Sequence, residues 1–177
     1  VVTGIRIAGE LKEQGYDILA TGEMGIGNTT TSSAVAAVLL DRPVEEVTGK
    51  GAGLTSEGLE RKISVIKEAI RRHRPDRDDA LDVMAKVGGL DIAGLAGVYL
   101  GGALYHIPVV VDGFISAVAA LCAARLVPAS LDYMMPSHVS KEPAGQMLLD
   151  ALGLAPFLTC DMCLGEGSGA VAVFPLL

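Results

Sequence analysis

Apolar residues recur at helical spacing over several stretches of the chain and predict amphipathic helices there. Residues 1–14 carry apolar side chains three or four positions apart, and residues 55–72 carry the clearest stripe. Thr55 stands where a side-chain cap is expected. Further helices are predicted over residues 29–40, 78–87, 91–105, 114–125 and 143–152, and a last one begins at residue 168.

Short apolar runs between these helices predict strands over residues 16–20, 107–111 and 130–133, whereas residues 43–53 are expected to form mostly loop. Residues 107–111 are continuously apolar, as buried parallel strands are. Strands that alternate with helices predict an α/β fold with a doubly wound, mostly parallel sheet and helices on both faces. All 177 residues are expected to form a single α/β core.

Composition and charge limit the kinds of partner that the protein is expected to bind. Half of the residues are hydrophobic but only 4% are aromatic, so the core must be built from small aliphatic side chains. The net charge of −7 argues against a nucleic-acid partner, because phosphate contacts need a basic surface. Residues 92–111 lack formal charge, but glycines and Pro108 interrupt them. We expect a buried helix that runs into a buried strand, and no membrane partner.

The cysteines indicate a reducing compartment. Cys122, Cys160 and Cys163 are odd in number, which fits free thiols and a cytoplasmic location. Cys160 and Cys163 form a single C-x-x-C pair without a second pair or a histidine pair nearby, which is a weak metal signal. We therefore expect neither a metal nor a cofactor.

Two glycine-rich turns, at residues 22–31 and 164–170, each hold one glutamate. Glycine lets backbone amides approach a ligand, and an amide-rich turn that opens a helix attracts anions. A carboxylate in such a turn would repel a bound phosphate unless it has a different role, such as taking a proton. The first turn lacks the Gly-Lys-Ser/Thr order of a Walker loop, so ATP binding is not expected. By itself it fits a packing turn as well as an anion site, and Glu23 could simply order it.

Other polar positions have two interpretations each. Asp112, at the end of a predicted strand, fits either a ribose-hydroxyl ligand or the cap of the helix over 114–125. Lys62 lies beside an apolar stripe, which fits snorkelling at the core edge. Ser140 fits a cap before the helix over 143–152, and Glu166 fits a cap of the last helix. His138 is expected at the surface or at a cap.

Six successive blocks carry a resemblance that covers nearly the whole chain. They read GEMGIGNTTTSSAV, GLTSEGLERKISVI, GGLDIAGLAGVYLGGA, VVVDGFISAVAALCAARL, HVSKEPAGQMLLDALGL and MCLGEGSGAVAVFPLL. Together they resemble the nicotinate-nucleotide–dimethylbenzimidazole phosphoribosyltransferase family. The resemblance implies transfer of the phosphoribosyl group of nicotinate mononucleotide to 5,6-dimethylbenzimidazole, which gives α-ribazole 5′-phosphate and nicotinate for the lower ligand of cobalamin. The alternative is a catalytically incomplete fragment that only binds the nucleotide, since we expect an N-terminal region and a short C-terminal tail of the family to be absent here.

The resemblance also assigns roles. Glu166 is the general base that takes the imidazole N–H proton of the benzimidazole. The positions implied for substrate binding are Glu23, Gly25, Asn28, Gly51, Lys62, Asp112, Ser140 and Leu164. Among them, Gly25, Gly51 and Lys62 are expected at the phosphate, and Leu164 at the aromatic base. The resemblance further implies a homodimer.

Overall fold

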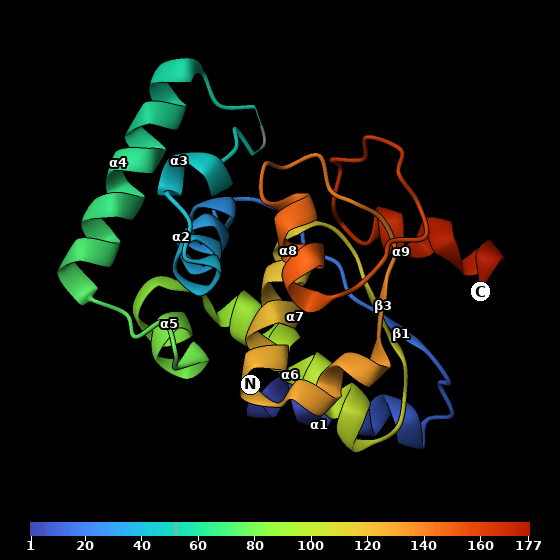
Figure 1. The fold of residues 1–177 in the computed structure, drawn as a ribbon. Coiled ribbons are helices and arrows are strands. Elements are labelled where there is room, and N and C mark those ends of the chain that lie inside the picture. The colour runs from blue at the N-terminus through green and yellow to red at the C-terminus, as the bar shows by residue number, and fades with distance from the viewer. Residues whose placement is uncertain (52) are drawn as a thin grey trace.

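A computed structural model of the chain describes residues 1–51 and 53–177 (Figure 1). Three short strands form its parallel sheet in the order β1-β2-β3, namely β1 (Leu19–Ala20), β2 (Val109–Val111) and β3 (Met134–Pro136). The α/β class and the parallel pairing are confirmed. The described sheet is small, and its strand order follows the chain order without a reversal.

Helices cover both faces of this sheet, as predicted (Figure 1). Val109 and Val111 of β2 belong to the main core, in which α6 and α7 pack. Val110 points to the opposite face and packs with Ala170 and Val173 of α9. The alternation follows from the period of two along a strand and explains why all three valines are buried.

Most of the predicted helices are confirmed within two residues of their predicted ends. Thr55 caps α4 as predicted, and its hydroxyl accepts from the Gly58 amide at 3.1 Å. The helices are α1 (Val2–Glu13), α2 (Thr29–Leu40), α3 (Val44–Val47), α4 (Ser56–His73), α5 (Ala80–Val87), α6 (Leu90–Leu104), α7 (Phe114–Leu126), α8 (Gly145–Leu152) and α9 (Ser168–Val173), with 3-10 turns η1 (Pro128–Tyr133) and η2 (Phe174–Leu176).

One predicted element differs. The strand over 130–133 is wrong, because these residues belong to η1, where Pro128 fixes φ at the start of the turn. The third strand is Met134–Pro136, which begins directly after η1 and pairs with β2. The described residues of 43–53 are mostly loop, as predicted, and include the four-residue helix α3.

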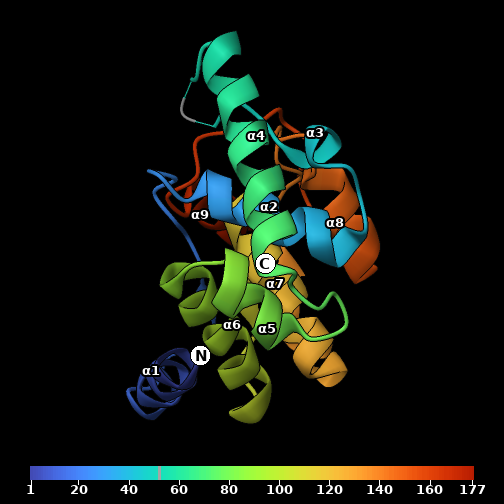
Figure 2. The same ribbon diagram turned by 90° about the vertical axis from the view of Figure 1, so that its left-hand side faces the viewer.

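Glycines let α1 lie directly against α6 (Figure 2). A Cβ on Gly4 would lie 2.0 Å from the carbonyl oxygen of Gly94, and one on Gly97 would lie 2.0 Å from that of Val1. Helix α6 then leads into β2, and both are largely buried, as predicted for residues 92–111. In the described part of the chain, no helix combines the length and the apolar character that crossing a membrane requires.

Candidate functional site

A cavity opens at the carboxyl end of the sheet, where β1 runs into the first glycine turn and β2 ends at Asp112. In α/β folds this edge is where ligands collect. Both glycine turns contribute to its wall. Six residues implied by the resemblance line it together, namely Glu23, Gly25, Gly51, Asp112, Ser140 and Leu164.

The first glycine turn is ordered by its own acid. Glu23 Oε2 accepts a hydrogen bond from the Gly25 amide at 2.5 Å, so the amide expected to face a phosphate is already bonded here. Asn28 does not line the cavity. Its Nδ2 donates to Asp91 Oδ2 at 2.6 Å and so ties the start of α2 to the start of α6.

Lys62 lies behind the cavity wall. The residue is 6% exposed, and its Nζ donates to Thr29 Oγ1 at 2.9 Å and to the Gly49 carbonyl oxygen at 3.0 Å. Snorkelling, in which the ammonium would stay in water, is therefore wrong for Lys62. Burial lowers the pKa of Lys62, and the negative charge of Glu142 partly opposes this by raising it. Thr29, to which Lys62 donates, lines the cavity wall.

Two observations favour glycine at position 51. Its φ is +55°, a conformation that costs an L side chain free energy. A Cβ there would also lie 2.8 Å from Thr29 Oγ1. The loop thus fits closely against the hydroxyl that Lys62 holds.

Asp112 joins the sheet to α9. It is 3% exposed, its Oδ2 accepts from the Gly167 amide at 3.1 Å, and its Oδ1 accepts from the Ala170 amide at 3.0 Å. The alternative that Asp112 caps the helix over 114–125 is wrong, because α7 has Gly113 as its N-cap and no side-chain cap bond. Asp112 instead accepts from free amides of α9, 55 or more residues further along the chain.

Glu166 lies on the second glycine turn and is exposed. Its φ is +60°, and its amide donates to the Glu23 carbonyl oxygen at 2.8 Å, which joins the two glycine turns. Its neighbours Leu164 and Gly165 line the cavity, whereas Glu166 itself is not among the lining residues. It does not cap α9, whose N-cap is Gly167 without a side-chain bond.

Residues before α8 complete the wall. Ser140 Oγ accepts from the Glu142 amide at 3.3 Å, so it also has the turn-capping role left open above. His138 is 4% exposed and hydrogen-bonds Ser137 Oγ at 2.9 Å, so a surface position is wrong. Burial lowers the pKa of His138, and the charge of Asp112 raises it in part.

Sequence reasoning missed several cavity residues. Thr29 could have been found as the first helical residue after a glycine turn, and Glu142 as the acid two positions after Ser140. Nothing in the sequence around His138 indicates that it is buried. Cys163 is an exposed free thiol that also lines the cavity, whereas Cys122 lies in the core, where burial raises the pKa of its thiol to about 12.

Comparison with known proteins gives a consistent result. A family model described as "Phosphoribosyltransferase" matches residues 1–177. The nicotinate-nucleotide–dimethylbenzimidazole phosphoribosyltransferase of Ruminiclostridium cellulolyticum is 53% identical over 177 residues, which is 100% of this chain and 50% of that relative. The protein of the same name from Acetivibrio thermocellus is 52% identical over 174 residues, 98% of this chain and 50% of that relative.

A solved structure has the same fold. The crystal structure of CobT from Thermus thermophilus superposes with a TM-score of 0.92 at 42% identity, and the match covers 98% of this chain and 52% of that chain. The chain therefore spans about half the length of the curated relatives and the solved structure that it matches.

Proposed function

The chain belongs to the phosphoribosyltransferase family whose model matches it across residues 1–177, and on this basis we propose that the whole protein transfers a phosphoribosyl group. The donor is nicotinate mononucleotide, the acceptor is 5,6-dimethylbenzimidazole, and the products are α-ribazole 5′-phosphate and nicotinate. The names of the two bacterial relatives support this choice of substrates.

One observation carries the proposal: both glycine turns reach the same cavity and supply complementary chemistry. Lys62 stands behind Thr29 and Gly51 with a buried ammonium that, among the described residues, donates to two uncharged acceptors. Glu166 stands next to Leu164 and Gly165 with an exposed carboxylate. A cation beside an amide-rich turn suits a phosphate, and a free carboxylate suits proton removal.

In the proposed reaction, one benzimidazole nitrogen attacks C1′ of the ribose while the bond from C1′ to the nicotinate nitrogen breaks. The attacking ring becomes cationic, and Glu166 takes the proton from its other nitrogen. Nicotinate leaves as a neutral pyridine nitrogen, so the departure needs no acid. Attack from the opposite face changes the configuration from β to α.

Glu166→Gln tests the base in the whole protein. Glutamine keeps the size and much of the hydrogen bonding but cannot accept the proton. We expect nucleotide affinity to persist while formation of α-ribazole 5′-phosphate falls about 10²–10⁴-fold, the usual contribution of a positioned base. Product is measured by chromatography and mass spectrometry, with Glu13→Gln, an exposed acid at the end of α1, as the matched control. Near-normal turnover in Glu166→Gln would end the assignment.

The same measurements separate the alternative of a nucleotide-binding module. A module binds nicotinate mononucleotide by calorimetry but forms no product under any condition. A homodimer and a cytoplasmic location remain parts of the proposal. Light scattering across a wide concentration range tests the first, and fractionation of the source cells tests the second.

A further inference from the structure

Glu142 lies beside the proposed phosphate site without an assigned task. It lines the cavity, yet its Oε2 is buried and has no hydrogen-bond partner among the described residues. A Cβ on Gly49 would lie 2.0 Å from this oxygen, so the carboxylate rests directly against the glycine backbone. A buried carboxylate oxygen without a partner is costly unless a nearby positive charge offsets the cost.

A positive charge lies at the same glycine. Lys62 Nζ donates to the Gly49 carbonyl oxygen at 3.0 Å, while Glu142 Oε2 occupies the space that a Cβ on Gly49 would need. The two charged groups form no ion pair within 4.0 Å among the described residues. Both groups lie against Gly49, which has no room for a side chain.

We propose that Glu142 is a positioning residue for Lys62, because its charge beside Gly49 holds the buried ammonium in its charged form beside the phosphate site. The inference rests on the phosphate-binding role proposed for Lys62. It assigns to a residue of the loop before α8 a task on α4, which lies about 80 positions away in sequence.

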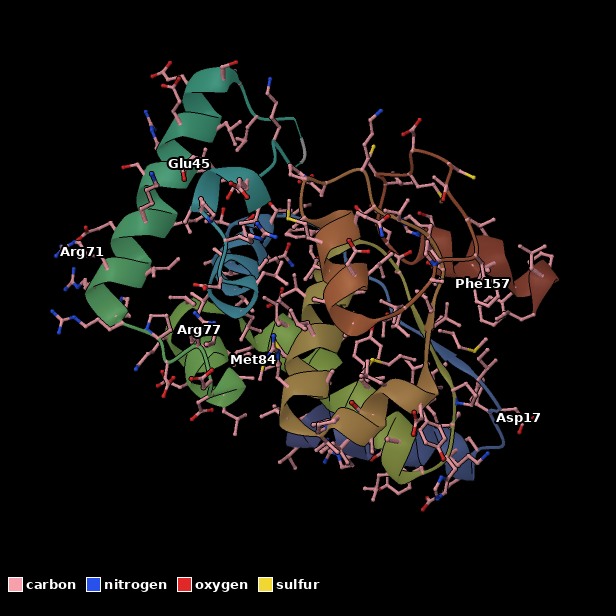
Figure 3. The ribbon with its side chains drawn as sticks, viewed as in Figure 1. Asp17, Glu45, Arg71, Arg77, Met84 and Phe157 are labelled. Atoms are coloured by element: carbon pink, nitrogen blue, oxygen red, sulfur yellow. The ribbon has the colours of Figure 1, made fainter. Side chains whose placement is uncertain are left out.

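Other charged groups around α4 do not take this role. Glu45 of α3 lies against α4, but it pairs with Lys67 (Figure 3). Helix α2 offers Lys62 only the hydroxyl of Thr29. The remaining charged or titratable side chains on α3, α4, α5 and the adjoining loops are exposed or paired elsewhere, among them Glu46, Lys50, Glu57, Glu60, Arg61, Glu68, Arg71, Arg72, His73, Asp82, Lys86 and Lys141.

The direction of the effect follows from the two influences on the ammonium. Burial lowers the pKa of Lys62 and the charge of Glu142 raises it, so removing that charge lowers the pKa further. The ammonium is then lost at a lower pH. An opposite charge in direct contact typically changes a pKa by about one to three pH units. Glu142 and Lys62 are further apart than that, so we expect the loss of the Glu142 charge to shift the Lys62 titration by up to about one pH unit.

The first experiment needs no nucleotide. The ε-carbon signals of isotope-labelled lysine are followed by NMR from about pH 8 to 12, and Lys62→Arg identifies the Lys62 signal. We expect Glu142→Gln to lower the Lys62 midpoint by up to about one pH unit. Glu60→Gln, an exposed acid on the same helix, is the matched control and should leave the midpoint unchanged. An unchanged midpoint in folded Glu142→Gln overturns the proposal, even if the protein proves to bind another substrate.

The second experiment measures affinity for nicotinate mononucleotide against pH by calorimetry. Glu142→Gln removes a negative charge near the phosphate, so near pH 7 its affinity should equal or exceed that of the unmodified protein. At alkaline pH it should lose affinity first, and the two curves should cross. In the Lys62→Arg variant the guanidinium stays charged at alkaline pH. Adding Glu142→Gln to that variant should therefore not shift the alkaline part of the affinity–pH curve. Parallel curves, or the same shift in the Lys62→Arg background, overturn the proposal; absence of binding in every variant overturns the proposed function instead.

Discussion

Replacing Asp112 by alanine should lower the stability of the protein, because it removes hydrogen bonds to the start of α9, and should not affect substrate binding alone. Asp112 accepts from the amides of Gly167 and Ala170 at 3.1 and 3.0 Å, and the residue is 3% exposed. Alanine leaves both amides without this acceptor at the start of a six-residue helix. No side chain bonds to that helix from its N-cap position, which is Gly167.

The magnitude follows from the two bonds. A hydrogen bond to a charged group contributes about 1.5–3 kcal/mol. Both bonds share one carboxylate and one helix terminus, so their losses are not independent, and we expect about 2–4 kcal/mol in total. For a chain of this size, that corresponds to a melting temperature lower by about 5–15 °C. An asparagine in place of the acid keeps one acceptor but turns an amide donor toward another donor, so the stability of Asp112→Asn should fall between those of the unmodified protein and Asp112→Ala.

Urea unfolding followed by circular dichroism gives the free energy, and hydrogen exchange locates the loss. Protection should fall at Gly167 and Ala170 before it falls in α7. Asp132→Ala, an exposed acid in η1, is the matched control and should change stability by less than about 0.5 kcal/mol. If Asp112→Ala is as stable as this control, the bonds to α9 do not matter and Asp112 serves the substrate alone.

Three further predictions concern single positions. Gly4→Ala should cost about 1–3 kcal/mol in urea unfolding, since its Cβ would meet the Gly94 carbonyl, and an unchanged midpoint would contradict the close α1–α6 packing. Gly51→Ala should keep the fold but weaken nicotinate mononucleotide binding about tenfold or more by calorimetry, because φ +55° and Thr29 both oppose the methyl group; normal affinity would separate this loop from the site. His138 has a pKa lowered by burial in the folded state, so its contribution to stability is complete above about pH 6.5 and is lost as pH falls toward the lowered value. His138→Gln should flatten the pH dependence of the unfolding free energy in that window, and an unaltered slope would show that His138 does not cause it.

Local patterns were sufficient for most helices and insufficient for one strand. The apolar stripe and the Thr55 cap of α4 lie within one segment, so the sequence alone locates the helix. Strand β3 instead depends on pairing with β2, some 25 residues earlier, and its own residues Met134–Pro136 give no alternating pattern. The burial of His138 also depends on a residue distant in sequence. Its ring packs against Gly169, 31 residues further along, where a Cβ would lie 2.0 Å from the ring.

The acids of the site show where residue type stops being informative. As residue types, Glu23, Asp112 and Glu166 look alike in the sequence, since each is a carboxylate beside glycines or at a strand end. In the folded chain their oxygens have different work: Asp112 binds two amides of α9, and Glu23 binds the Gly25 amide. Only Glu166 keeps its carboxylate in solvent, while its backbone is fixed by a bond to Glu23 and its neighbour Gly167 by the bond to Asp112. The base that we propose must be free to take a proton and yet held in place. If Glu166 has that role, substitutions at Asp112 should reduce turnover as well as stability, because Asp112 holds the neighbouring Gly167.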